Sequence, residues 1–208
     1  MLKESGEKIS DGRWRSRAAE RNGQVIWETV QPYLPENGLV AEIASGTGQH
    51  IAQFAQLSPQ LQWQPTEPDS DLRRSIEKEI LLSGLSNISQ PLSVNVLSNL
   101  DVLPETKLIL NINMLHVSPP LAMPGLFRCV SQSLETGGHF FLYGPFIHEG
   151  VFNSEGNKAF HLSLMKSNED WGLREIIEVI AEAAKHSLRL LSKVDMPANN
   201  SSLIFQQG

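Results

Sequence analysis

Residues 40–50 read VAEIASGTGQH and join an apolar segment to a short turn that contains two glycines. The acid Glu42 lies inside the apolar segment, and Gly46 and Gly48 follow it. Glycine accepts backbone conformations and close ligand approaches that other residues resist. A carboxylate here would repel a pyrophosphate, whereas it suits a ligand with an ammonium group or hydroxyl groups. The pattern therefore favours a binding turn for a cationic nucleoside without phosphate.

A second acid supports this interpretation. Glu67 ends the next apolar segment, where a carboxylate can accept hydrogen bonds from both hydroxyls of a ribose. S-adenosylmethionine carries ribose hydroxyls, an amino group and a sulfonium, and it has no phosphate. It is therefore the predicted cofactor.

Other sites fit the sequence less well. A dinucleotide turn needs a small residue at the position of Ile51, so an NAD-dependent oxidoreductase is disfavoured. A P-loop needs lysine and a hydroxyl residue where Gln49 and His50 stand. The histidines lack H-x-x-x-H spacing, and no G-x-S-x-G elbow occurs, so neither a metal site nor a serine hydrolase is predicted. The single cysteine, Cys129, is interpreted as a buried structural thiol.

A strand and a helix must position the glycine turn. GLVAEIA is typical of a buried strand and HIAQFAQL of a helix that opens at the glycines. The alternation of strands and helices continues along the chain, with a weak third strand expected around Leu92 to Val96 and a hairpin-like pair at the end. This alternation predicts a doubly wound, mostly parallel sheet covered by helices on both faces. Such sheets bind ligands beyond the carboxyl ends of their strands.

The composition sets broader bounds. The chain has 208 residues, 40% of them hydrophobic, and a formal net charge of -6, which fits one domain over residues 1–208. The chain has no excess of positive charge that would indicate binding to nucleic acid or to anionic lipid. No apolar run reaches the roughly 18 residues of a spanning helix, and the charged start lacks an apolar signal core. We expect a soluble cytoplasmic protein, a monomer or homodimer, that acts on a small molecule and not on membranes.

An ordered set of motifs resembles the class I S-adenosylmethionine-dependent methyltransferases, and more closely one uncharacterised methyltransferase-like family. The motifs run from Arg17 to Asn200 and are RAAERN, EIASGTGQH, WQPTEPD, INMLHVSP, GGHFFLYGPF, NEDWGLRE and MPANN. The resemblance implies a Rossmann-like α/β fold with a seven-stranded, mostly parallel sheet. Its expected strand order is 3-2-1-4-5-7-6, with the last strand antiparallel.

The resemblance also implies where S-adenosylmethionine would bind. The methionine part would lie at the glycine turn and near the main chain after the fourth strand, the ribose at Glu67, and the adenine between Pro68 and Asn95. The family more often has aspartate at the positions of Glu67 and Asn95. Arg21 and Asn22 on the first helix suit the cofactor's carboxylate or, alternatively, form a solvated helix face. The remaining candidate cofactor residues are Glu42, Ala44, Gly46, Thr47, Gly48, Asn113 and Met114.

The implied activity is methyl transfer to an unidentified small or medium-sized acceptor, with S-adenosylhomocysteine as product. Such an in-line displacement depends on positioning and exclusion of water and needs no nucleophilic side chain. His116 is the candidate base for the acceptor's proton, and a histidine that caps the next helix is the alternative. The side chains of Tyr143, Phe146, Asn199 and Asn200 either wall an acceptor pocket or have ordinary packing and turn roles. Trp171 is interpreted as a packing anchor, with a stacking platform as the alternative. A cofactor-binding regulatory protein without turnover is the alternative function.

Overall fold

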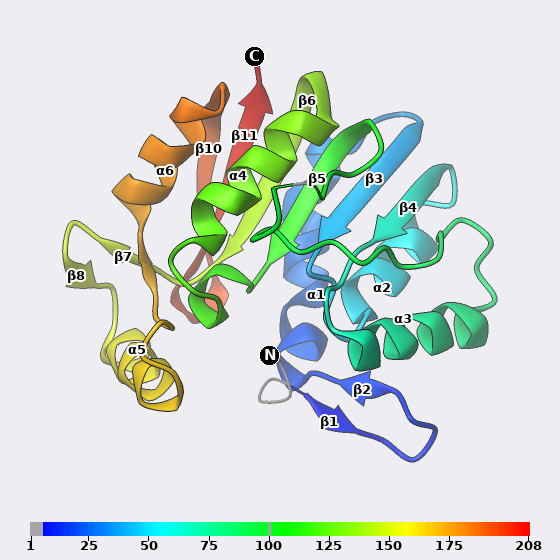
Figure 1. Cartoon of the computed structure of the whole chain (residues 1–208), viewed down its shortest axis with the longest axis horizontal. Coiled ribbons are helices and arrows are strands. Elements are labelled where there is room, and N and C mark those ends of the chain that lie inside the picture. The colour runs from blue at the N-terminus through cyan, green and yellow to red at the C-terminus, as the bar shows by residue number, and fades with distance from the viewer. Residues whose placement is uncertain (1–5, 100) are drawn as a thin grey trace.

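The sheet at the centre of the molecule connects segments from both halves of the chain (Figure 1). The computed structural model describes residues 6–99 and 101–208. Within these ranges the sheet has six strands in the order β10-β11-β6-β5-β3-β4. Their bounds are β3 (Gly38–Ile43), β4 (Leu61–Pro65), β5 (Thr106–Ile112), β6 (Leu134–Gly144), β10 (Leu188–Met196) and β11 (Asn200–Gln207).

Strand directions follow the α/β pattern. β3 pairs in parallel with β4 and β5, and β5 pairs in parallel with β6. The carboxyl-terminal β11 is antiparallel to both of its neighbours, β6 and β10. The mostly parallel sheet with a carboxyl-terminal antiparallel hairpin is therefore confirmed.

The expected count of seven strands is wrong for the part of the chain that the structure describes. Around the predicted third strand, only two isolated parallel bridges form, joining Ile88 to Trp63 and Leu92 to Thr66. Pro91 lacks the N–H that a ladder requires. Further on, the side chain of Asn95 accepts a hydrogen bond from the N–H of Leu97 at 3.0 Å, which turns the backbone out of the sheet.

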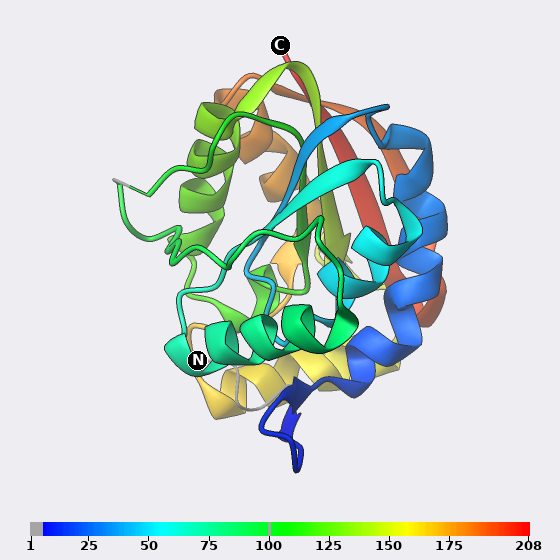
Figure 2. The ribbon, with the colours of Figure 1, turned by 90° about the vertical axis from the view of Figure 1, so that its right-hand side faces the viewer.

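Helices cover both faces of the sheet (Figure 2). On one face, apolar side chains of α1 (Arg17–Val30) and α2 (Gln49–Leu57) pack against the sheet. They include Phe54 of α2, and the sheet contributes Trp63 of β4. On the other face, α4 (Ala122–Ser133) and α6 (Ile176–Lys185) bury Phe127, Phe140 and Phe205. Cys129 lies in this second core with 1% exposure, and burial raises the pKa of its thiol to about 11.

The remaining elements lie at the carboxyl ends of the parallel strands (Figure 1). They are a hairpin of β1 (Glu7–Lys8) and β2 (Trp14–Arg15), α3 (Ser70–Ser83), α5 (Glu155–Ser167), a small sheet of β7 (Phe146–His148), β8 (Val151–Phe152) and β9 (Arg174–Glu175), and the short 3-10 helices η2 (Leu115–Val117) and η3 (Pro197–Asn199). A third short helix, η1 (Gln31–Tyr33), continues α1.

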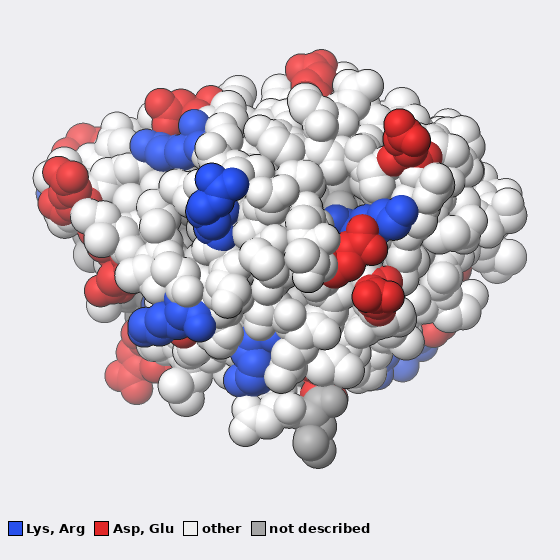
Figure 3. Space-filling model, turned by 90° about the horizontal axis from the view of Figure 1, so that it is seen from above, with Lys and Arg blue, Asp and Glu red and all other residues white. Residues whose placement is uncertain are grey.

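The surface seen from above presents side chains of both charge signs. Lysine and arginine are interspersed with aspartate and glutamate over this face (Figure 3). No helix among residues 6–99 and 101–208 combines the length and the apolar character that crossing a bilayer requires.

Candidate functional site

A cavity of about 1060 Å³ opens at the carboxyl ends of β3, β5 and β6. Its walls come from the amino-terminal hairpin, α1, the glycine turn, η2, α5 and η3. This is the edge of the sheet where α/β folds bind ligands, and the volume is at the upper end of the range for small-molecule sites.

Two adjacent parallel strands end in residues with left-handed backbone. Ala44 follows β3 with a φ of 57°, and Asn113 follows β5 with a φ of 59°. Both residues line the cavity. Left-handed backbone is unfavourable for residues with a Cβ and is often retained at functional sites. Both strand ends therefore turn sharply at the cavity wall.

The two glycines of the turn have different surroundings. Gly46 lines the cavity with a φ of 56°, and a Cβ added there would meet no atom within 4 Å. Gly48 lies outside the lining, and its Cβ would come within 3.2 Å of the Cα of Ile76. Gly46 therefore leaves space in the cavity, whereas Gly48 allows α3 to approach the turn.

Glu42 is the buried acid of the cavity wall, with 3% of its surface exposed. One carboxylate oxygen, Oε1, lies 4.0 Å from Nδ1 of His50. The other, Oε2, has no hydrogen-bond partner among the described residues. Burial raises the pKa of Glu42 to about 8. An ammonium or hydroxyl group in the cavity would supply the missing partner and favour the carboxylate form.

A neutral histidine lies next to this acid. His50 Nε2 lies 2.9 Å from Oδ1 of Asn22, and burial lowers the pKa of His50 to about 4. The imidazole is therefore uncharged at neutral pH and cannot neutralise Glu42. Asn22 lines the cavity and also lowers the pKa of Tyr143 through a hydrogen bond, although burial of Tyr143 raises that pKa more.

Glu67 faces the glycine turn. Its Oε2 accepts a hydrogen bond from the N–H of Gly46 at 2.9 Å, and its Oε1 accepts one from the N–H of Asp69 at 3.0 Å. The side chain is 1% exposed and does not line the cavity. Burial raises its pKa, and the two backbone hydrogen bonds act in the opposite direction. The sequence suggested that this carboxylate is open to a ribose, whereas in the structure both of its oxygens accept hydrogen bonds from backbone N–H groups.

The residues predicted for adenine also lie outside the cavity lining. The carbonyl of Pro68 accepts a hydrogen bond from Nη1 of Arg73 at 2.8 Å. Asn95 is exposed and is occupied by its own turn, because the expected third strand does not form there. The structure therefore does not bring Pro68 and Asn95 together with the other candidates.

The first helix contributes a cation to the cavity mouth. Arg21 is exposed, lines the cavity and forms no ion pair with another described residue. A guanidinium without a carboxylate partner is suited to an anionic group of a ligand. Thr47 and Met114 also line the cavity.

His116 lies in η2 and is 7% exposed. A Cβ at Gly144 would lie 3.7 Å from its Nδ1 and 3.8 Å from Oδ1 of Asn113, so both polar side chains converge on the end of β6. Burial, with a smaller effect from Arg174, lowers the pKa of His116 to about 4. The rings of His116 and Phe160 pack edge-on, with 5.4 Å between their centroids. A neutral imidazole at the cavity wall can accept a proton, and the same position suits packing beneath α5.

Several wall residues were not among the candidates. The amino-terminal hairpin contributes Arg15, the N-cap of α1 contributes Ser16, and α5 contributes Phe160 and Ser163. The hairpin has a sequence signal in the turn SDGR, because Asp-Gly favours tight turns. α5 has a weak signal, because its apolar residues Phe160, Leu162, Leu164 and Met165 do not share one helix face. In the structure this helix buries only Asn157 and Leu164. Of the residues with two interpretations, Tyr143, Trp171 and Asn200 line the cavity, whereas Phe146 lies in the core.

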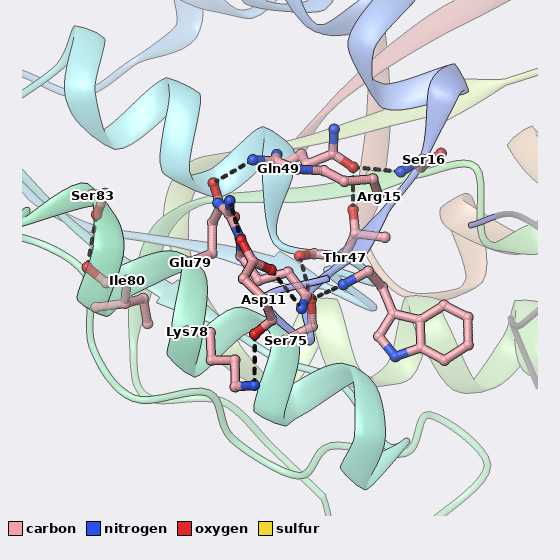
Figure 4. A network of polar contacts seen from close by, with 12 residues as sticks. Asp11, Arg15, Ser16, Thr47, Gln49, Ser75, Lys78, Glu79, Ile80 and Ser83 are labelled. Carbon is pink, nitrogen blue, oxygen red and sulfur yellow. Dashed lines mark hydrogen bonds and ion pairs between the residues drawn. The ribbon is translucent and has the colours of Figure 1, made fainter. Parts of the chain in front are cut away.

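Polar contacts fasten the hairpin to α3 and to the glycine turn (Figure 4). Ser75 Oγ accepts a hydrogen bond from the N–H of Trp14 at 2.8 Å and donates one to the carbonyl of Thr47 at 3.3 Å. Gln49 Oε1 accepts from the N–H of Ser16 at 2.6 Å and from the Thr47 hydroxyl at 2.9 Å. The hairpin and the turn are therefore joined through the side chains of Ser75 and Gln49. The described residues contain no cluster of three or more His, Cys, Asp or Glu that could hold a metal ion.

Comparison with known proteins identifies a family and a fold. The family described as "Protein of unknown function (DUF938)" matches residues 13–207. An O-methyltransferase family protein from Burkholderia thailandensis is similar at a TM-score of 0.79 and 17% identity, over 92% of this chain and 57% of that one. Human N-acetylserotonin methyltransferase in complex with SAM has a TM-score of 0.77 and 13% identity, over 92% and 53%. PigF with SAH has a TM-score of 0.76 and 16% identity, over 91% and 56%. The chain thus shares the class I methyltransferase fold and spans little more than half the length of these structures.

Proposed function

The chain belongs to the DUF938 family, and we propose that it is an S-adenosylmethionine-dependent methyltransferase that acts on a small or medium-sized acceptor. The fold supports the reaction class, because solved structures with this fold include a methyltransferase in complex with SAM and a protein in complex with SAH. At this low sequence identity, the cofactor and the reaction must be argued from the cavity itself.

The observation that carries the proposal is the unpartnered carboxylate oxygen of Glu42 at the cavity wall. A buried polar atom without a partner is costly, so a ligand that supplies a donor is favoured. The amino group of the cofactor is such a donor. Arg21 suits the cofactor's carboxylate, and the backbone at Ala44, Gly46 and Asn113 borders the same space.

The predicted ribose contact of Glu67 needs the carboxylate to become accessible. Each oxygen already accepts one backbone N–H group and can accept a second hydrogen bond, but Glu67 is 1% exposed and lies outside the cavity lining. The observed geometry supports a role of Glu67 in holding the turn beside the cofactor. The ribose contact remains a proposal.

In this reaction the protein positions the cofactor and the acceptor and takes up the proton that the acceptor loses. When bound, the cofactor supplies an electrophilic methyl group on a sulfonium. Orientation of the reactants contributes on the order of 7–11 kcal/mol to such reactions, and a closed site excludes competing water. The amino-terminal hairpin and α5 form walls of the cavity, and the neutral imidazole of His116 can accept a proton from the acceptor.

Calorimetric titration tests the cofactor directly. We expect binding of S-adenosylmethionine and S-adenosylhomocysteine and no response to NAD. Tight NAD binding without a response to either adenosyl ligand would overturn the proposal. Binding without methyl transfer to any acceptor would favour the alternative, a regulatory protein that keeps the cofactor site.

A further inference from the structure

The charges that line the cavity are unevenly distributed along the chain. All of the charged lining residues lie between Glu7 and Glu42, and Arg15, Arg17 and Arg21 are the others. The lining from Leu72 onward contains no aspartate, glutamate, lysine or arginine. This second part of the lining comes from α3, η2, α5, η3, the ends of β5 and β6 and adjoining loops. It is called the uncharged wall below, and the charged lining residues belong to the hairpin, α1 and β3.

Aromatic rings make up much of the uncharged wall. His116, Tyr143, Phe160 and Trp171 line it, and the rings of His116 and Phe160 meet edge-on at 5.4 Å. Phe160 lies on α5 beside the cavity, and 41% of its surface is exposed. Exposed rings at a cavity wall suit a flat apolar partner, because aromatic groups gain from stacked and edge-on contacts.

The polar groups of this wall are neutral and partly fixed. Asn157 Nδ2 donates hydrogen bonds to the carbonyl of Asn199 at 2.9 Å and to Oδ1 of Asn153 at 2.7 Å, which ties α5 to η3. Ser163 lines the cavity six residues further along α5. Such groups can bind a hydroxyl or carbonyl, but they cannot neutralise a charge.

A positive charge lies behind this wall. Arg174 is outside the cavity lining, and its guanidinium donates hydrogen bonds to the carbonyls of Ser118 and Asp170. Burial is the larger cause of the lowered pKa of His116 and of His161, and the positive charge of Arg174 lowers both further. A cationic acceptor beside His116 would therefore meet repulsion without a carboxylate partner from this wall.

We propose that the methyl acceptor is an uncharged molecule with a flat, mostly apolar body and a hydroxyl group, bound against this wall with the hydroxyl at His116. The inference rests on the proposed function. In the reaction, the acceptor oxygen forms a bond to the methyl carbon while the bond from that carbon to sulfur breaks, and the electron pair stays on sulfur. The hydroxyl proton passes to the imidazole. Charged acceptors are disfavoured because burying a charge without a partner is costly.

Three probes with the same phenol ring test the inference: 4-hydroxybenzyl alcohol, which is neutral, 4-hydroxybenzoate, which is anionic, and tyramine, which is cationic. Each is titrated into the protein saturated with S-adenosylhomocysteine. We expect the neutral probe to bind at least about tenfold more tightly than either charged one. Equal or tighter binding of a charged probe would overturn the inference, as would binding of none. Failure of S-adenosylhomocysteine to bind in the first step would instead overturn the proposed function.

A charge added to the wall provides a second test. Ser163→Asp places a carboxylate in the cavity, and Ala159→Asp places one on the exposed side of the same helix, outside the lining. We expect Ser163→Asp to shift the preference from 4-hydroxybenzyl alcohol toward tyramine by about tenfold, and Ala159→Asp to leave it unchanged. The same shift in both variants would show that the wall does not select acceptors by charge.

Discussion

Oε2 of Glu67 accepts a hydrogen bond from the backbone N–H of Gly46 at 2.9 Å, which connects the segment after β4 to the turn after β3. The second oxygen of the same carboxylate accepts from the N–H of Asp69 at 3.0 Å, next to the start of α3. With 1% of the residue exposed, water cannot replace either bond. The carboxylate is thus part of the structure that shapes the turn.

Glu67→Gln should therefore destabilise the ligand-free protein. The amide NH2 cannot accept a hydrogen bond, so one backbone N–H loses its partner in a buried site. We expect the free energy of unfolding to fall by about 1–3 kcal/mol in urea titrations. Glu175→Gln is the matched control, because Glu175 also accepts two backbone N–H bonds, from Glu149 and Gly150, at a solvent-exposed position. Equal small losses in both variants would contradict a structural role for Glu67.

Gly46→Ala should weaken cofactor binding more than it weakens the fold. The added methyl group would occupy the cavity, where no protein atom lies within 4 Å. Gly84→Ala is the control, since Gly84 also has left-handed backbone with φ of 67° and open space at its Cβ, but caps α3 away from the cavity. Both changes should cost about 1–2 kcal/mol of stability from backbone strain. Only Gly46→Ala should reduce affinity for S-adenosylhomocysteine in calorimetry, and similar affinities would rule out the turn as the site.

Cofactor binding should release protons at neutral pH. With a pKa of about 8, Glu42 is about nine-tenths protonated at pH 7 in the ligand-free protein. The ligand's ammonium favours the carboxylate, so binding should release close to one proton. Calorimetry of S-adenosylhomocysteine in buffers of different ionisation enthalpy measures this number. Glu42→Gln should abolish the release and lower the affinity by roughly 10- to 100-fold.

Adenosine provides the control for this proton release, because it has the nucleoside but no amino acid part. Its binding should leave Glu42 protonated. Equal proton release with adenosine and with S-adenosylhomocysteine would place the titrating group elsewhere. His50 and Glu67 are the titratable neighbours of Glu42, and His50 is already neutral at pH 7.

His116 should make the folded protein sensitive to acid. Its pKa falls from 6.5 to about 4 on folding, so between these values the unfolded chain binds more protons than the folded one. Stability therefore rises with pH from about 4 to 6.5 and is independent of this group above 6.5. The contribution is at most about 3 kcal/mol. The difference in unfolding free energy between the natural protein and His116→Asn should change over this interval, and a constant difference would contradict the shifted pKa.

The sequence was informative where local patterns decide the structure. The apolar segment before Gly46 and the helix after Gly48 follow from periodicity and glycine placement. The position of Glu42 inside that segment identifies it as a candidate ligand-binding residue. The alternation of strands and helices predicted the mostly parallel sheet. These features depend on residues close together in the chain.

Long-range contacts set the limits of the prediction. Nothing in the spacing of Glu67 shows that its carboxylate turns toward Gly46, because that depends on how β3 and β4 pair. The wall formed by α5 also depends on contacts between segments far apart, such as that of Asn157 with Asn199. The expected third strand was overestimated from its apolar residues, since Pro91 and the turn at Asn95 oppose a ladder.

Ser75→Ala should loosen the amino-terminal hairpin and the glycine turn together. Ser75 is fully buried, and its hydroxyl bridges the N–H of Trp14 and the carbonyl of Thr47 (Figure 4). Without it, each of these backbone groups loses a partner, at about 1 kcal/mol or more per group. Hydrogen exchange should become roughly five- to tenfold faster at Trp14 and in the turn. Ser83→Ala on the same helix removes two exposed bonds, one to the carbonyl of Ile80 and one from the N–H of Leu85, so it should leave these rates unchanged. Faster exchange at Trp14 alone would show that the hairpin and the turn move independently.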